Sequence, residues 1–222
     1  MPARAAEEVH ISNEFVTTVE NLVLAKQQAP TGDRNTLLMA YWSLAFEIHR
    51  GILSLIDQKF FGAAFALVRP IFEAALRAHI ALSGSDNVIG QLHADTYQTN
   101  FGTVGKEIDT AFGLDGFFEN LLKRTKNALH SYTHAGVHQL GRRFTGIDLA
   151  ANYNEDEIVE VIRSCTSCVF MVNNLMTKHF KWEEEWKQNT ELFVEWGKHP
   201  NDRKATPSWM QLPAVYQKAE HD

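Results

Sequence analysis

Residues 60–84 read FFGAAFALVRPIFEAALRAHIALSG, and this stretch decides the fold. Its apolar residues continue nearly all the way round a helix, which indicates a helix that is buried on most of its surface. Pro70 lies well inside the stretch. Because proline has no amide hydrogen and its ring collides with the preceding turn, we expect the helix to kink or to split near Val68. Gly84 is the expected C-cap.

The sequence on both sides of this stretch is also helical by pattern, because apolar residues recur at three-to-four spacing. Asn154 followed by Glu157 is the signature of a capped helix start. No internal repeat and no run of alternating strands is visible. The strong helical segments are residues 13–28, 33–58, 60–84, 115–140 and 155–180, and weaker ones are residues 86–97, 104–112 and 182–196. The sequence therefore predicts an all-α fold, a kinked helical bundle of five to seven helices.

Composition favours one ordinary globular domain. The chain has 222 residues, 45% hydrophobic and 22% charged, which is enough to bury a core without disulfides. We expect a single domain over residues 1–198 and an extended C-terminal tail over residues 199–222, which carries three prolines. The sequence lacks a long apolar span and an apolar leader, and its two cysteines make no disulfide framework, so we expect a cytoplasmic protein with no membrane contact.

The segment 123–143, KRTKNALHSYTHAGVHQLGRR, concentrates positive charge and histidine. On a helix, His134 and His138 lie on the side opposite Leu129, and His130 lies near the boundary, so we expect the histidines to face away from the core. The net charge of the chain is −6, yet this segment holds five basic residues and no acid. Such a patch attracts phosphate groups. Its basic residues are Lys123, Arg124, Lys126, Arg142 and Arg143.

Two plainer interpretations of this segment stay open. A basic helix face is often simply a solvated surface. Alternatively, His130 and His134 stand four residues apart and could share a metal ion, but the zinc-protease pattern needs a glutamate where this chain has Ser131. A third metal ligand would have to come from elsewhere. The candidates are His49, Glu73, His79 and His93. We expect no metal and no other cofactor.

A third interpretation comes from a resemblance. Arg124 and His130 flank the five residues TKNAL, which resembles the Arg-x(4–6)-His motif of the HEPN superfamily. These are small all-helical domains that include many metal-independent ribonucleases of bacterial toxin and phage-defence systems. Thr125 stands where the motif usually has a stronger polar residue. The segments FFGAAFALVRPIFEAALRAHIAL and NALHSYTHAGVHQLGRRF also resemble a bacterial group of uncharacterised helical proteins, often placed near that superfamily.

The resemblance implies a metal-independent endoribonuclease or toxin-type effector of a bacterial defence system. Arg124 would clamp the phosphate, and His130, assisted by His134, would take the proton of an RNA 2′-hydroxyl or protonate the leaving oxygen. In such families the site forms across a homodimer. RNA would also contact the remaining polar residues of the segment, which are Lys123, Lys126, Asn127, His138, Arg142 and Arg143. The alternative is a non-catalytic helical scaffold or regulatory subunit that binds a protein or nucleic acid.

Other polar residues lie in strongly apolar surroundings. Arg69, Glu73 and Arg77 follow one another at four-residue spacing, so Glu73 could bridge both arginines as a structural ion ladder. They could equally line a polar pocket at the Pro70 kink that His134 or Tyr132 reaches, which would bind an anionic small molecule or hold the catalytic helix in place.

The remaining histidines, the cysteines and the tryptophans are expected to have structural roles. We expect His49 and His79 to be interior or boundary histidines and Cys165 and Cys168 to be free thiols in the core, because CTSC lies in a helical pattern and not after a strand. Exposed tryptophan is unfavourable, so the indole rings near the end of the chain should pack on the bundle or on a second copy. These are Trp182, Trp186 and Trp196.

Overall fold

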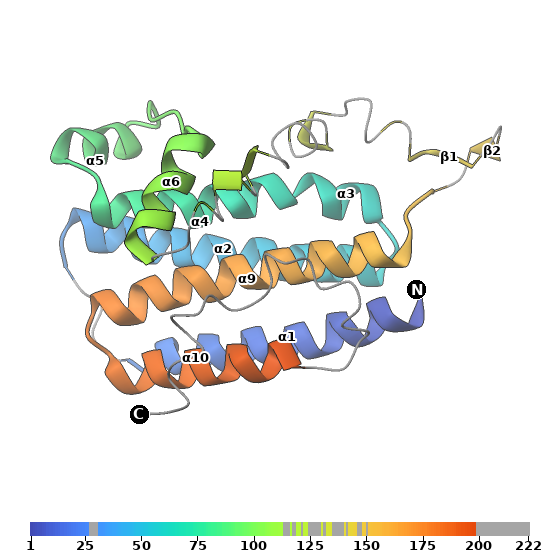
Figure 1. The fold of residues 1–222 in the computed structure, drawn as a ribbon, viewed down its shortest axis with the longest axis horizontal. Helices are drawn as coiled ribbons and strands as arrows, with labels where there is room; N and C mark the ends of the chain where they lie inside the picture. Colours follow the sequence, from blue (N-terminus) through green and yellow to red (C-terminus); the bar gives the residue numbers. More distant parts are fainter. Residues whose placement is uncertain are drawn as a thin grey trace.

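The computed structural model is an all-α bundle, as the sequence predicts (Figure 1). It describes residues 1–26, 31–112, 116, 119–120, 122–123, 130, 132–134, 140, 142–145, 148–149 and 151–198. The long helices are α1 (Ala3–Leu24), α2 (Asp33–Asp57), α4 (Val68–Ser83), α9 (Glu155–His179) and α10 (Glu183–Lys198). The shorter elements are α3 (Phe61–Ala66), α5 (Asp86–His93), α6 (Phe101–Phe112), β1 (Phe144–Thr145) and β2 (Asp148–Leu149). The expected tail, residues 199–222, lies outside the described residues.

The break in the decisive helix falls where proline requires it. α3 ends at Ala66 and α4 begins at Val68, so Leu67 separates them. Pro70 then stands in the first turn of α4, where an amide hydrogen would have no partner within the helix. With α3 and α4 counted as one bent helix, the described residues form seven helices. Gly84 is the C-cap of α4, and its amide donates to the carbonyl of Ile80.

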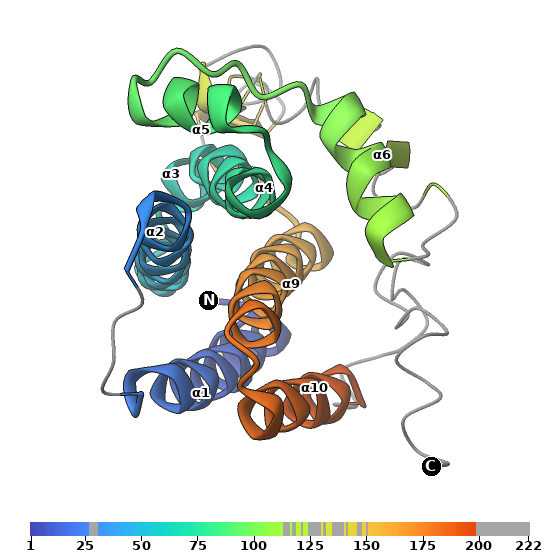
Figure 2. The same cartoon turned by 90° about the vertical axis from the view of Figure 1, so that its left-hand side faces the viewer.

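Helix α9 is the centre of the bundle. Viewed end-on, it lies between α2 and α4 on one side and α1 and α10 on the other (Figure 2). Asn154 caps its start with a complete capping box, because Asn154 and Glu157 each accept the other's backbone N–H. Within the described part of the chain, α9 alone has the length and apolar composition to cross a membrane, but 78% of its apolar window is buried inside the bundle. It has the burial of a core helix.

Helix α1 begins ten residues earlier than the apolar pattern predicts. The apolar periodicity starts near Phe15, whereas the helix starts at Ala3. Polar contacts with α9 account for the extra turns. The buried Glu8 binds Arg163 with an oxygen–nitrogen distance of 2.8 Å, and Glu155 accepts a hydrogen bond from the backbone amide of Arg4 at 2.7 Å. Such pairings between distant segments leave no periodic signal in the sequence.

The predicted interior residues are buried. Cys165 and Cys168 on α9 are free thiols, and both are buried in the core. His49 is fully buried, and its Nε2 atom lies 2.9 Å from the hydroxyl oxygen of Thr166. Trp182 and Trp196 pack against the core, as the sequence predicts.

Candidate functional site

The candidate site begins with Arg69 on the first turn of α4. The Nε atom of Arg69 donates a hydrogen bond to Oε1 of Glu73, one turn further along, at 2.9 Å. The guanidinium group also lies over the ring of Phe101, 5.6 Å from its centroid, at the start of α6. The side chains of Arg69 and Glu73 are 26% and 30% exposed. The ion pair is therefore fixed on the bundle surface but remains open to solvent.

A histidine from the basic segment completes this cluster. The Nη1 atom of Arg69 lies 3.0 Å from Nδ1 of His130. A guanidinium group has only N–H donors, so Nδ1 must accept the hydrogen bond. The ring is therefore neutral, and its single proton lies on Nε2. The His134 ring is close by, with ring centroids 4.5 Å apart. We define the Arg69 cluster as Arg69, Glu73, His130 and His134.

Both histidines of the cluster face away from the core. His130 and His134 are exposed, and the amide of His134 donates to the carbonyl of His130 at 3.1 Å, as in a helical turn. This orientation agrees with the helical-wheel prediction for these two residues. Four other residues of the segment that were assigned to catalysis or RNA binding lie outside the described residues. They are Arg124, Lys126, Asn127 and His138.

Arg77 does not take part in the expected ion ladder. Its Nε donates to the hydroxyl of Thr99 at 3.2 Å, and its Nη2 donates to the carbonyl of Tyr97 at 3.4 Å. Asp95 supplies a carboxylate at 3.7 Å. Glu73 therefore pairs with Arg69 and does not bridge both arginines. The reason is that the loop before α6 offers Arg77 two fixed oxygens and a charge, and this anchors the loop on α4.

The positive charge of segment 123–143 is partly neutralised, contrary to the prediction from the segment alone. Glu119 binds Lys123 at 2.8 Å, and the hydrogen bond and charge of this lysine lower the pKa of the Glu119 carboxyl. Glu157 at the start of α9 binds Arg142 through both carboxylate oxygens. The segment itself contains no acid, but residues just before it and after it supply the counter-charges.

Arg142 has a structural position. Besides Glu157, its Nε donates to the hydroxyl of Tyr132 at 2.8 Å, and its Nη1 donates to the carbonyl of Asn152 at 3.3 Å. Tyr132 in turn packs edge-on against Phe65 of α3, with ring centroids 5.2 Å apart. Tyr132, which lies between His130 and His134 in the chain, is thus held on the bundle. The predicted contact of Arg142 with RNA remains a prediction.

Arg143 has a different environment from its neighbour. It is exposed and follows the turn that its amide makes with the carbonyl of Leu140 at 3.0 Å. Its Nη2 atom lies 2.6 Å from the position that a Cβ atom on Gly62 would occupy. Only glycine allows the guanidinium to lie this close to the start of α3. Its predicted role in RNA binding also remains a prediction.

Comparison of the sequence with known protein families assigns the chain to one of them. The sequence pattern of a family of unknown function, DUF6988, matches residues 42–195. The chain belongs to the DUF6988 family. The match contains the whole Arg69 cluster, and it makes no connection with the HEPN superfamily. No curated protein and no solved structure matches the chain.

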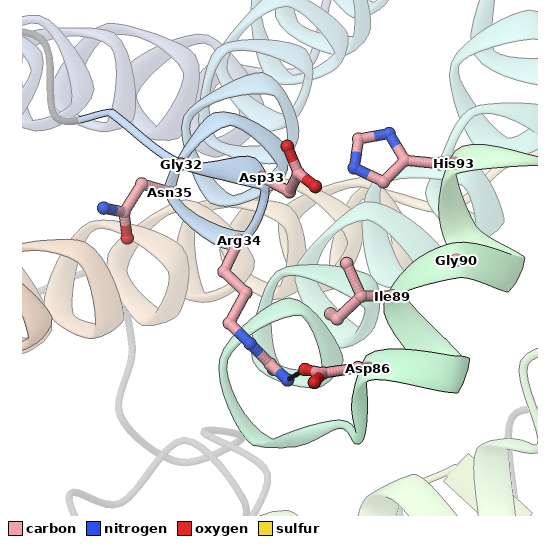
Figure 3. A pocket seen from close by; sticks show the side chains of 8 residues that line it. All are labelled: Gly32, Asp33, Arg34, Asn35, Asp86, Ile89, Gly90 and His93. Atoms are coloured by element: carbon pink, nitrogen blue, oxygen red, sulfur yellow. Dashed lines mark hydrogen bonds and ion pairs between the residues drawn. The ribbon is translucent and has the colours of Figure 1, made fainter.

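The DUF6988 chain also has a surface pocket of about 490 Å³ between the start of α2 and one face of α5. The carboxylate of Asp33 faces the ring of His93 across it, and Arg34 reaches to Asp86 (Figure 3). Arg34 also donates to the carbonyl of Gly84 at 2.6 Å, so it caps the end of α4. The pocket shares no residue with the Arg69 cluster.

No group of three His, Cys, Asp or Glu side chains within the described parts of this DUF6988 protein is placed to hold a metal ion. His49 and His79, two of the possible third ligands, are buried, and burial lowers the pKa of both rings. Sequence reasoning missed two features of the site, the Phe101 ring under Arg69 and the link from Tyr132 through Arg142 to Glu157. Only Glu157 had a sequence signal, as the glutamate at position N3 of a capping box.

Proposed function

We propose that this protein is a HEPN-like, metal-independent endoribonuclease that holds the scissile phosphate of RNA at the Arg69 cluster. The observation that carries the proposal is the 3.0 Å contact between Arg69 and His130, because it joins a phosphate-binding cation to an imidazole on an exposed surface. An RNA-cleaving member of a bacterial toxin or defence system needs both groups at one point. Arg124 of the Arg-x(4–6)-His motif remains the second proposed phosphate ligand.

The donors of the cluster suit a phosphate. Arg69 uses Nε for Glu73 and one hydrogen of Nη1 for His130, and no described residue accepts a hydrogen bond from Nη2, which we assign to an anion. The Nε2 hydrogen of His130 is a further donor. Two donors aimed at the non-bridging oxygens would stabilise the charge that develops during phosphoryl transfer. This chemistry needs neither a metal ion nor another cofactor.

We also propose that the active form is a homodimer in which two Arg69 clusters lie close together. The exposure of His130 and His134 supports this, since both rings are accessible to a second copy. A dimer would exclude water from the cluster and strengthen its electrostatic interactions.

A second candidate function has its own support. Lys123 and Arg142 are already bound to Glu119 and Glu157, so two of the predicted RNA contacts are engaged within the chain. That arrangement favours a non-catalytic scaffold or regulatory subunit that binds a protein or nucleic acid through the rest of this surface. It predicts binding without cleavage.

The test is cleavage of end-labelled single-stranded RNA by the purified protein in the presence of EDTA. We expect cleavage by the natural chain and a loss of about 100-fold or more in Arg69→Lys and His130→Asn, because lysine cannot keep both contacts of Arg69 and asparagine has no imidazole. Matched controls are Arg50→Lys, a second ion-paired arginine, and His93→Asn, a histidine outside the cluster. Intact RNA under saturated binding would favour the scaffold and overturn the ribonuclease.

A further inference from the structure

The tautomer of His130 leaves the proposed reaction without a base. Its Nδ1 lone pair accepts the hydrogen bond from Arg69, and its Nε2 carries the proton. Neither nitrogen can therefore take a proton from an RNA 2′-hydroxyl while the contact with Arg69 holds. His130 remains useful as a donor to the phosphate. Another group in the cluster must accept the proton.

Glu73 has the properties of that group. Its Oε1 accepts from Arg69 at 2.9 Å, while no described residue donates a hydrogen bond to its Oε2. The side chain is 30% exposed, so a substrate hydroxyl can reach the second oxygen. In its carboxylate form Glu73 has two acceptor oxygens and no proton to give. A positioned carboxylate is an established kind of general base.

His134 is the remaining ring of the cluster. It is exposed, lies 4.5 Å from His130 between ring centroids, and makes no side-chain hydrogen bond to a described residue. Nothing in the described cluster fixes its tautomer, in contrast with His130. When protonated, the ring can give a proton to a leaving oxygen. The two histidines therefore have different roles, although they stand one helical turn apart.

We propose that Glu73 is the general base and His134 the general acid of an RNA transphosphorylation, an inference that rests on the proposed ribonuclease function. Glu73 takes the proton of the 2′-hydroxyl, and the 2′-oxygen forms a bond to phosphorus. The bond between phosphorus and the 5′-oxygen breaks, and that oxygen takes the proton of the His134 imidazolium. Arg69 and the Nε2 hydrogen of His130 bind the non-bridging oxygens. The products are a 2′,3′-cyclic phosphate and a 5′-hydroxyl.

The experiment uses an oligonucleotide with one ribonucleotide, prepared with either oxygen or sulfur as the bridging 5′ atom. Sulfur leaves without a proton, so it removes the need for an acid but not for a base. We expect His134→Asn to slow the oxygen substrate by about 100-fold or more and the sulfur substrate by less than about 5-fold. Glu73→Gln should slow both by about 100-fold or more, with binding of an all-deoxy analogue unchanged.

Each other result has a distinct meaning. If Glu73→Gln cleaves both substrates like the natural chain, Glu73 is not the base, although the ribonuclease function stands. If the sulfur substrate rescues Glu73→Gln but not His134→Asn, the two roles are reversed and this proposal is overturned. If the natural chain leaves both substrates intact, the ribonuclease function itself fails. If the glutamine variant does not fold, Glu73→Asp provides the same comparison, because it keeps a carboxylate on a shorter side chain. We expect Glu73→Asp to cleave both the oxygen and the sulfur substrate at least about 10-fold more slowly than the natural chain.

Discussion

Glu157 holds the guanidinium group of Arg142 with both of its carboxylate oxygens, and it also completes the capping box of α9. One side chain thus connects the start of the central helix with the end of the histidine-bearing segment. Arg142 passes this connection on to Tyr132, which lies between His130 and His134 in the chain. The placement of the two histidines of the Arg69 cluster therefore depends on a residue of α9 that does not belong to the cluster.

Glu157→Gln should separate the two functions of this side chain. Glutamine still caps a helix, but it cannot form the charge-assisted pair with Arg142. We expect a loss of about 1–2 kcal/mol in the free energy of unfolding, measured by urea denaturation, because the two groups are only about a quarter exposed. Glu184→Gln, at an exposed position on α10, should stay within about 0.5 kcal/mol of the natural chain. Equal stabilities for both variants would mean that the ion pair contributes nothing.

Gly105 and Gly90 form a second matched pair. A Cβ atom on Gly105 of α6 would lie 3.0 Å from the backbone N and Cα of Glu119, which cannot move without shifting the chain. A Cβ atom on Gly90 of α5 would meet nothing within 4 Å. We expect Gly105→Ala to destabilise by about 1–3 kcal/mol and Gly90→Ala to stabilise by about 0.5–1 kcal/mol. Melting temperatures that shift in the same direction would contradict this close approach of α6 to Glu119.

The sequence predicted the fold where local signals decide it. Four features follow from chemistry within a few residues, and each is found in the structure: the apolar surface of residues 60–84, the helix break that Pro70 imposes near Val68, the Gly84 cap and the Asn154 capping box. The apolar pattern of the sequence did not predict contacts between segments that are distant in the chain. The extra turns of α1 depend on Glu8 and its partner on α9, which lie 155 residues apart in the chain.

The candidate site shows the same limit. Sequence reasoning found Arg69 and His130 but assigned them to separate features, because nothing local indicates that residues 61 positions apart share a hydrogen bond. It also paired Arg77 with Glu73 because the two residues stand four positions apart. That spacing rule applies to the surface of an isolated helix. In the bundle, the loop before α6 supplies better oxygens for Arg77 than Glu73 does. Spacing identifies possible pairs, and tertiary contacts choose among them.

His49 should make the protein less stable in acid. The hydroxyl of Thr166 donates to the carbonyl of Ile162, so it accepts the Nε2 hydrogen of His49, and the ring is neutral. Burial lowers the pKa of His49 to about 3, against 6.5 in the unfolded chain. Between these values only the unfolded state binds the proton, so stability falls as the pH drops below 6.5. His79, whose pKa burial also lowers, acts in the same direction.

The measurement for His49 compares urea denaturation at pH 7.5 and pH 5.0. One histidine of this kind should account for about 2 kcal/mol of the loss between these values. His49→Gln should reduce the difference by that amount, whatever its stability at pH 7.5, whereas the exposed His10→Gln should leave it unchanged. An undiminished difference in His49→Gln would show that this ring is not kept neutral by the fold.

Cys165 and Cys168 should be unreactive until the bundle opens. Burial raises the pKa of both thiols, and the second thiol adds to the effect at Cys165, so almost no thiolate is present near neutral pH. Both side chains are buried between α9 and the helices that pack against it. A reagent therefore reaches them only when these helices separate from α9. We expect native protein at pH 8 to resist iodoacetamide, and Cys165→Ala and Cys168→Ala to label their remaining thiol at equal rates, since one opening exposes both. Ser43→Cys, at an exposed position on α2, is the fast-labelling control. Stoichiometric labelling of either native cysteine within the time needed for this control would show that the thiols are accessible in the folded bundle.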